Sequence, residues 1–173
     1  GIRCAKMGAT EVVMLEESLS FAQVCRNNVN RNDVGDQCTV LHRGSVLDEL
    51  KNMETSGIRF NCVALNLRPK MERYFKQRRG QFGRWFKPSL KDYSRAVTLG
   101  ASVTSRGGYL VMSFLLPLTG EHWALSLVRD GLDLATRTGS LVFHRVGVDE
   151  HSALASSTME DAWTNVVICV RLH

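Results

Sequence analysis

Residues 12–33, VVMLEESLSFAQVCRNNVNRND, decide the fold of this chain. The stretch opens with an apolar run, residues 12–15, which is typical of a buried strand and ends on the acids Glu16 and Glu17. Ser18 then stands where a helix N-cap belongs, because its hydroxyl can accept a hydrogen bond from the first turn. The helix that follows is predicted to bury one apolar face, made of Leu19, Ala22, Cys25 and Val29.

A strand that ends in an acid and leads into a helix is typical of the second half of a nucleotide-binding βαβ unit. In such a unit the carboxylate can accept hydrogen bonds from both hydroxyls of a ribose. Two interpretations of Glu16 therefore stay open: it binds a ribose, or it is one of two solvated glutamates at a strand tip. Acids at strand ends are common, so the pattern alone does not decide between them.

Strands and helices alternate around this stretch, which predicts one α/β domain over residues 1–173. We expect a Rossmann-like, mostly parallel sheet with helices on both faces, because the middle of residues 61–66 is uniformly apolar. Gly107 and Gly108 are expected to break the helix that precedes the fourth strand. Helices are predicted over residues 1–9, 46–53, 90–104 and 120–137, and strands over residues 38–42, 61–66, 109–116, 141–148 and 165–172. The predicted inward side chains of the last two helices are Leu90, Tyr93, Val97, Ala101 and Thr104, and Ala124, Leu127, Gly131 and Leu134.

The composition fits one globular domain with a sizeable core, since 173 residues carry 44% hydrophobic side chains. No apolar run reaches membrane-spanning length, and the amino end has no signal-peptide pattern. The chain begins with Gly1 rather than methionine, as a fragment or a processed product would. Its five cysteines are scattered, so we expect neither a zinc site nor a disulfide framework. Buried thiols, with Cys25, Cys62 and Cys169 inside apolar patterns, indicate a reducing compartment, the cytoplasm or the mitochondrial matrix.

Five quoted segments, taken in order, carry a resemblance to a known family. They are MGATEVVMLEESLSFAQVCRNNVNRND (7–33), FNCVALNLRPK (60–70), LKDYSRAVTLGASVTSRGGYLVMSF (90–114), and VGVDEHS (146–152) with NVVICVRL (165–172). The ordered set resembles a class I S-adenosylmethionine-dependent methyltransferase that starts just after its first strand. It is most similar to the bacterial large-subunit ribosomal RNA cytosine-C5 methyltransferases. The resemblance implies a methyltransferase-like domain with a carboxyl-terminal antiparallel strand pair.

The resemblance implies S-adenosylmethionine as cofactor and assigns three residues to it. Glu16 matches the acid that holds the cofactor ribose, and Gly1 matches the last residue of the family's glycine-rich loop. Where the family has an acid for the adenine amino group, this chain reads His-Arg-Gly-Ser, and Ser45 is the residue that could still accept that bond. The family's central first strand is absent, so either it lies upstream or another chain fills its place.

The catalytic motif departs from the family in two ways. Asn66 and Pro69 match the first and last positions of an Asn-Pro-Pro variant of the Asp-Pro-Pro motif, but Leu67 and Arg68 interrupt it. In the family this loop holds the target base, and the Asn66 amide would orient an acceptor nitrogen. Transfer to cytosine C5 needs a cysteine thiolate, and the strand over residues 109–116 ends without one. The resemblance therefore does not extend to thiolate-dependent C5 chemistry.

A basic, aromatic-rich loop over residues 68–91 indicates RNA binding. Residues 68–95 hold ten Lys or Arg against two acids, while the rest of the chain holds twelve against fifteen. Cations can neutralise phosphates and interleaved aromatic rings can stack on bases. The other interpretation is a solvated basic loop whose aromatic rings cover the core. The predicted RNA-binding residues are Lys70, Arg73, Lys76, Arg78, Arg79, Arg84, Trp85 and Lys87.

Two functions from different classes remain open on the sequence. The chain is either a methyltransferase acting on RNA, most readily ribosomal RNA, or a non-catalytic structural or assembly component of a ribosome or other ribonucleoprotein particle. Ribosomal or assembly proteins would then be its partners, and neither a membrane nor a metal is expected. A third function, methylation of a small molecule, is disfavoured by the basic loop, because that loop indicates RNA binding. Residues 149–152 either border the active-site edge or form a polar hairpin turn.

Overall fold

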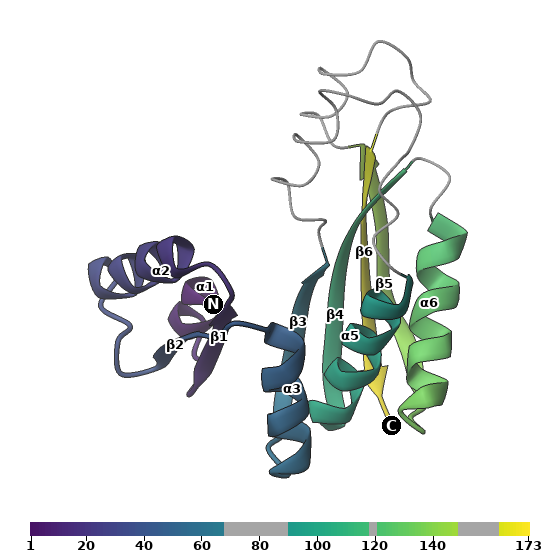
Figure 1. Cartoon of the computed structure of the whole chain (residues 1–173), viewed down its shortest axis with the longest axis horizontal. Coiled ribbons are helices and arrows are strands. Elements are labelled where there is room, and N and C mark those ends of the chain that lie inside the picture. Colours follow the sequence, from purple (N-terminus) through teal and green to yellow (C-terminus); the bar gives the residue numbers. More distant parts are fainter. Residues whose placement is uncertain (68–89, 118–120, 149–162) are drawn as a thin grey trace. The chain divides into compact units, whose positions relative to one another are not determined.

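The protein was analysed as a computed structural model that describes residues 1–67, 90–117, 121–148 and 163–173 (Figure 1). The chain forms two compact units, Gly1–Asn52 and Met53–His173. Each unit has its own sheet, of two strands in the first and four strands in the second. None of the helices in the described ranges is long and apolar enough to cross a membrane.

The first unit is built around a parallel strand pair. Strands β1 and β2 pair in register from Val12 opposite Cys38 to Glu16 opposite His42. A small core of Ala5, Val29, Val34 and Cys38 packs against the apolar side chains of the two strands. The elements, in order, are α1 (Ile2–Lys6), β1 (Val12–Glu16), α2 (Leu19–Arg31), β2 (Cys38–His42) and the start of α3 (Val46–Thr55).

The predicted start of α2 is confirmed, and one position of its predicted inward face is wrong. The Ser18 hydroxyl accepts a hydrogen bond from the Phe21 N–H at 3.5 Å, as an N-cap does. Ala22 and Val29 are buried, whereas Leu19 is 63% exposed. Leu19 is the first residue of the helix, and the buried contacts of α2 begin one turn later, at Ala22.

The second unit is a mixed sheet in the order β3-β4-β6-β5. Strand β3 pairs parallel with β4, while β6 pairs antiparallel with both β4 and β5. The α/β class, with parallel strands and a carboxyl-terminal antiparallel pair, is thereby confirmed. The elements are β3 (Phe60–Leu67), α5 (Leu90–Val103), β4 (Thr104–Pro117), α6 (Glu121–Leu134), β5 (Gly139–Val148) and β6 (Trp163–Leu172).

One face of this sheet carries the core of the unit, beside α5 and α6 (Figure 1). Alternate residues of β4, namely Leu110, Met112 and Phe114, are fully buried. The Tyr93 ring of α5 meets the Phe114 ring edge to face, with centroids 6.2 Å apart. The predicted inward residue Leu134 is instead 68% exposed, because it is the last residue of α6 and lies beyond its packed turns.

Two further expectations about this unit are corrected. Strand β4 begins at Thr104, so Gly107 and Gly108 lie inside the strand and do not end the helix. Gly107 has a φ of +74°, and a β-carbon on Gly108 would lie 2.8 Å from the Asn61 carbonyl oxygen. Cys62 is exposed rather than buried, since strand alternation directs Val63 and Leu65, and not Cys62, toward the core.

Candidate functional site

Glu16 is the last residue of β1, at the carboxyl end of the parallel strand pair. Its Oε1 accepts a hydrogen bond from the Ser18 N–H at 2.9 Å, so the turn into α2 fixes the carboxylate. The Glu16 side chain is partly exposed. In the described part of the chain no other hydrogen bond reaches this carboxylate, which leaves Oε2 able to accept from a ligand.

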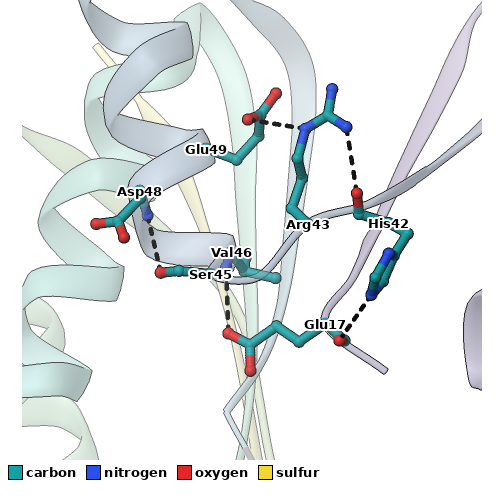
Figure 2. A network of polar contacts seen from close by, with 7 residues as sticks. All are labelled: Glu17, His42, Arg43, Ser45, Val46, Asp48 and Glu49. Atoms are coloured by element: carbon teal, nitrogen blue, oxygen red, sulfur yellow. Dashed lines mark hydrogen bonds and ion pairs between the residues drawn. The ribbon is translucent and has the colours of Figure 1, made fainter. Parts of the chain in front are cut away.

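Glu17 connects the end of β1 to the start of α3. Its Oε1 accepts a hydrogen bond from the Val46 N–H at 3.1 Å, and its carbonyl oxygen lies 3.2 Å from His42 Nε2 (Figure 2). The first N–H groups of a helix have no partner within the helix, and the helix dipole favours negative charge there. The Glu17 carboxylate therefore stabilises the start of α3. The interpretation that Glu16 and Glu17 are both merely solvated does not hold for Glu17.

Ser45 caps the same helix. Its Oγ accepts a hydrogen bond from the Asp48 N–H at 3.2 Å, so the hydroxyl keeps its proton to donate elsewhere. Two residues earlier, Arg43 forms an ion pair with Glu49, with Nε 3.0 Å from Oε2, and donates from Nη1 to the His42 carbonyl at 3.2 Å (Figure 2). The segment after β2 is thus a fixed cation followed by a helix cap.

Gly1 lies against the strand that carries Glu16. A β-carbon on Gly1 would overlap the Met14 sulfur, so the backbone of Gly1 packs directly on that side chain. Met14 and Glu16 are two residues apart in β1 and therefore point to the same face of the strand. Ser45 follows β2, whose last residue, His42, is opposite Glu16. The structure thus brings the three predicted cofactor residues to the surroundings of one strand end.

Of the two predicted catalytic residues, Asn66 is described, and it belongs to the second unit. Asn66 is exposed near the carboxyl end of β3, opposite Ser113 of β4. Pro69 lies outside the described residues. So do the residues predicted to bind RNA, which are Lys70, Arg73, Lys76, Arg78, Arg79, Arg84, Trp85 and Lys87, and the loop over residues 149–152.

Sequence reasoning missed the polar network of Glu17, His42, Arg43 and Glu49. The signal for one part of it was present, because Ser45 and Asp48 have the spacing of a capping box at the start of a helix. The partners Glu17 and Val46 are separated by 29 residues, and no local pattern joins them.

Comparisons with known proteins support the fold. No protein-family model matches this sequence, and no curated protein matches it. Among solved structures, a putative SAM-dependent methyltransferase from Streptococcus mutans has a TM-score of 0.68 at 11% identity, covering 96% of this chain and 40% of that one. SMU.776, a putative methyltransferase complexed with SAH, has a TM-score of 0.61 at 10% identity, covering 96% and 41%.

A tRNA m1G37 methyltransferase from M. jannaschii has a TM-score of 0.57 at 9% identity, covering 99% of this chain and 40% of that one. This chain thus spans about two fifths of the length of these solved proteins. At such low identity the likeness concerns the fold, which is that of class I methyltransferases.

Proposed function

We propose that this chain belongs to a protein that binds S-adenosylmethionine and methylates RNA, with the cofactor ribose on Glu16. The observation that carries the proposal is the position of one carboxylate. Glu16 ends a parallel strand, and one of its oxygens is held by the Ser18 N–H while the other has no partner in the described residues. Open α/β sheets bind ligands at the carboxyl ends of their strands.

A ribose is the ligand that suits this carboxylate. Its two adjacent hydroxyls can donate to the two oxygens of one ionised carboxyl group, and bonds to a charged acceptor are stronger than neutral ones. The fold adds support, since one solved protein of the same fold is SMU.776, a putative methyltransferase complexed with SAH. Ser45, whose Oγ already accepts from Asp48, would donate its proton toward the adenine ring rather than accept from the amino group.

RNA is the substrate that the charge favours. Ten of the 22 basic residues fall within residues 68–95, where phosphates would be neutralised. One protein of this fold is a tRNA methyltransferase. We take ribosomal RNA as the first candidate, because the quoted segments of the sequence resemble those of ribosomal RNA methyltransferases. Asn66 and Pro69 would position a nitrogen acceptor, since no cysteine stands where thiolate attack on cytosine would need one.

A second candidate, an RNA-binding component without catalysis, is favoured by the segment after β2. Arg43 is paired with Glu49 where the family has a free acid, and the Ser45 hydroxyl oxygen is engaged by α3. The carboxylates at this segment, Glu49 and Glu17, are already bonded to Arg43 and to the Val46 N–H, so an adenine amino group would find no unengaged acid in this described segment. In this alternative the RNA contacts are kept, ribosomal or assembly proteins are the partners, and S-adenosylmethionine does not bind.

Calorimetry with S-adenosylmethionine, together with a titration of RNA, separates the two candidates. The methyltransferase candidate predicts micromolar cofactor binding by the full-length protein, lost in Glu16→Ala and kept in Glu11→Ala, an exposed acid just before β1. Absence of cofactor binding with retained, salt-sensitive RNA affinity would support the non-catalytic candidate and end the first one.

A further inference from the structure

Three arginines of the second unit lie near Thr104 in the strand register or contact it, where α5 ends and β4 begins. Phe60 is opposite Thr104 in the parallel pair β3–β4, so Arg59 stands beside this junction, and Arg106 follows it by two residues. The Arg137 guanidinium reaches the same place from the loop after α6. Its Nη1 donates to the Thr104 carbonyl at 2.9 Å and to the Ala101 carbonyl at 3.3 Å.

The other donor atoms of Arg137 are left without an acceptor. Nε and Nη2 are both buried, and neither has a hydrogen-bond partner within the described residues. A buried donor without a partner costs about 1–3 kcal/mol, and more when the group is charged. Buried polar groups therefore almost always have a partner, from the protein, from water or from a ligand.

The charge at this junction is unbalanced. No ion pair links Arg59, Arg106 or Arg137 to a carboxylate in the described part of the chain. Burial, and the neighbouring charges of Arg106 and Arg59, lower the pKa of the Arg137 guanidinium. Neighbouring like charges raise the energy of the folded protein, and a bound anion lowers it. Arg59 and Arg106 are exposed, so a ligand can reach them.

We propose that Arg59, Arg106 and Arg137 form a phosphate-binding site at the junction of α5 and β4. Guanidinium groups present paired donors that match the oxygens of a phosphate; the exposed Arg59 and Arg106 can present theirs to a ligand, and Arg137 adds its positive charge. The ligand is either a free phosphate group or the backbone of an RNA strand. None of these three arginines is among the residues predicted to bind the cofactor or RNA, and the site does not require cofactor binding.

Arg106→Gln is the test variant, because Arg106 is exposed and makes no hydrogen bond or ion pair within the described residues, so its loss spares the fold. Arg129→Gln is the matched control, with a side chain on α6 that is 74% exposed. Thermal unfolding of the full-length protein is measured in inorganic phosphate and in chloride at equal ionic strength. Binding of a short single-stranded RNA is then measured over a series of salt concentrations.

Either source of the phosphate gives a distinct positive result. A free phosphate raises the Tm of the parent and of Arg129→Gln above that in chloride, but not the Tm of Arg106→Gln. An RNA backbone gives weaker binding by Arg106→Gln, with the slope of log K against log salt reduced by about 0.7. The proposal is overturned if phosphate acts like chloride and both variants bind RNA alike.

Discussion

Glu16 and Glu17 are neighbours in the chain, yet their carboxylates bond to different elements. Glu16 accepts from the Ser18 N–H in its own turn, and Glu17 accepts from the Val46 N–H at the start of α3. Glu16 is the last residue of β1 and Glu17 is the first residue beyond it, and the two identical residues meet different surroundings. Glu17 is committed to the protein, which leaves Glu16 as the acid available to a ligand.

The caps of α3 are predicted to stabilise the first unit. Ser45→Ala and Glu17→Ala each remove an acceptor for the first turn of the helix. We expect each to lower the free energy of unfolding by about 1 kcal/mol, as loss of a helix cap does. Urea denaturation measures the change, with Glu11→Ala as control. Variants as stable as the control would show that solvent satisfies these N–H groups equally well.

For single residues, the sequence predicted the hydrogen bonds whose two partners are close in the chain. The prediction that Ser18 caps α2 is confirmed. The sequence could predict this cap because the partner, Phe21, is only three residues away. The contacts of Arg137 with Ala101 and Thr104 span more than 30 residues, and nothing local in the sequence indicates them. The ligand roles of Gly1, Glu16, Ser45 and Asn66 stay predictions.

Helices α5 and α6 approach closely at one glycine. A β-carbon on Gly131 would lie 2.5 Å from Val97 Cγ1 and 2.8 Å from Val97 Cβ, too close for a real contact. Val97 is fully buried and β-branched, so its side chain cannot turn away. The small residue therefore sets how closely the two helices pack.

Gly131→Ala is predicted to destabilise the second unit, although alanine is the better helix former. Overpacking costs about 1–3 kcal/mol, which exceeds the gain in helix propensity of about 1 kcal/mol. Thermal or urea unfolding measures the difference. Gly35→Ala is the control, since a β-carbon there has no neighbour within 4 Å. A Gly131→Ala protein that is more stable than its parent would mean that α5 and α6 can separate freely.

The packing of α5 on the sheet also predicts a pH dependence. Burial raises the pKa of the Tyr93 phenol from 10.0 to about 12. Above pH 10 the unfolded chain loses this proton while the folded protein keeps it, so stability falls as the pH rises from 10 toward 12. Denaturant unfolding across this range should show a smaller decline for Tyr93→Phe than for the parent. Equal declines would assign the effect to other groups.

Element types were more predictable than element ends. Strand β2 has the predicted bounds because both sides of its apolar run are polar. Helix α5 ends at Val103, before the Gly107–Gly108 pair that was expected to stop it, and the Thr104 hydroxyl donates to the Gly100 carbonyl at that end. The exposed Leu134 has the right spacing for an inward residue, but it lies where the helix stops packing.

For the whole molecule, alternation of strands and helices was enough to predict the α/β class. It could not predict the division into two sheets, because strand order depends on contacts between distant segments. The expectation that β3 is covered on both faces came from its apolar middle, yet Ala64 and Cys62 are exposed in the described structure. The apolar composition of a strand shows that its side chains can be buried, but it does not show which elements pack on each face.

The binding of S-adenosylhomocysteine and of its 2′,3′-dideoxy analogue, measured by calorimetry, tests the ribose role of Glu16 most directly. We expect the parent to prefer the ribose ligand by about tenfold or more, since a hydrogen bond to a charged group contributes about 1.5–3 kcal/mol. Glu16→Gln, which can still accept from the Ser18 N–H, should lose most of that preference and bind the analogue as the parent does. The same preference in parent and variant would contradict a ribose held by Glu16.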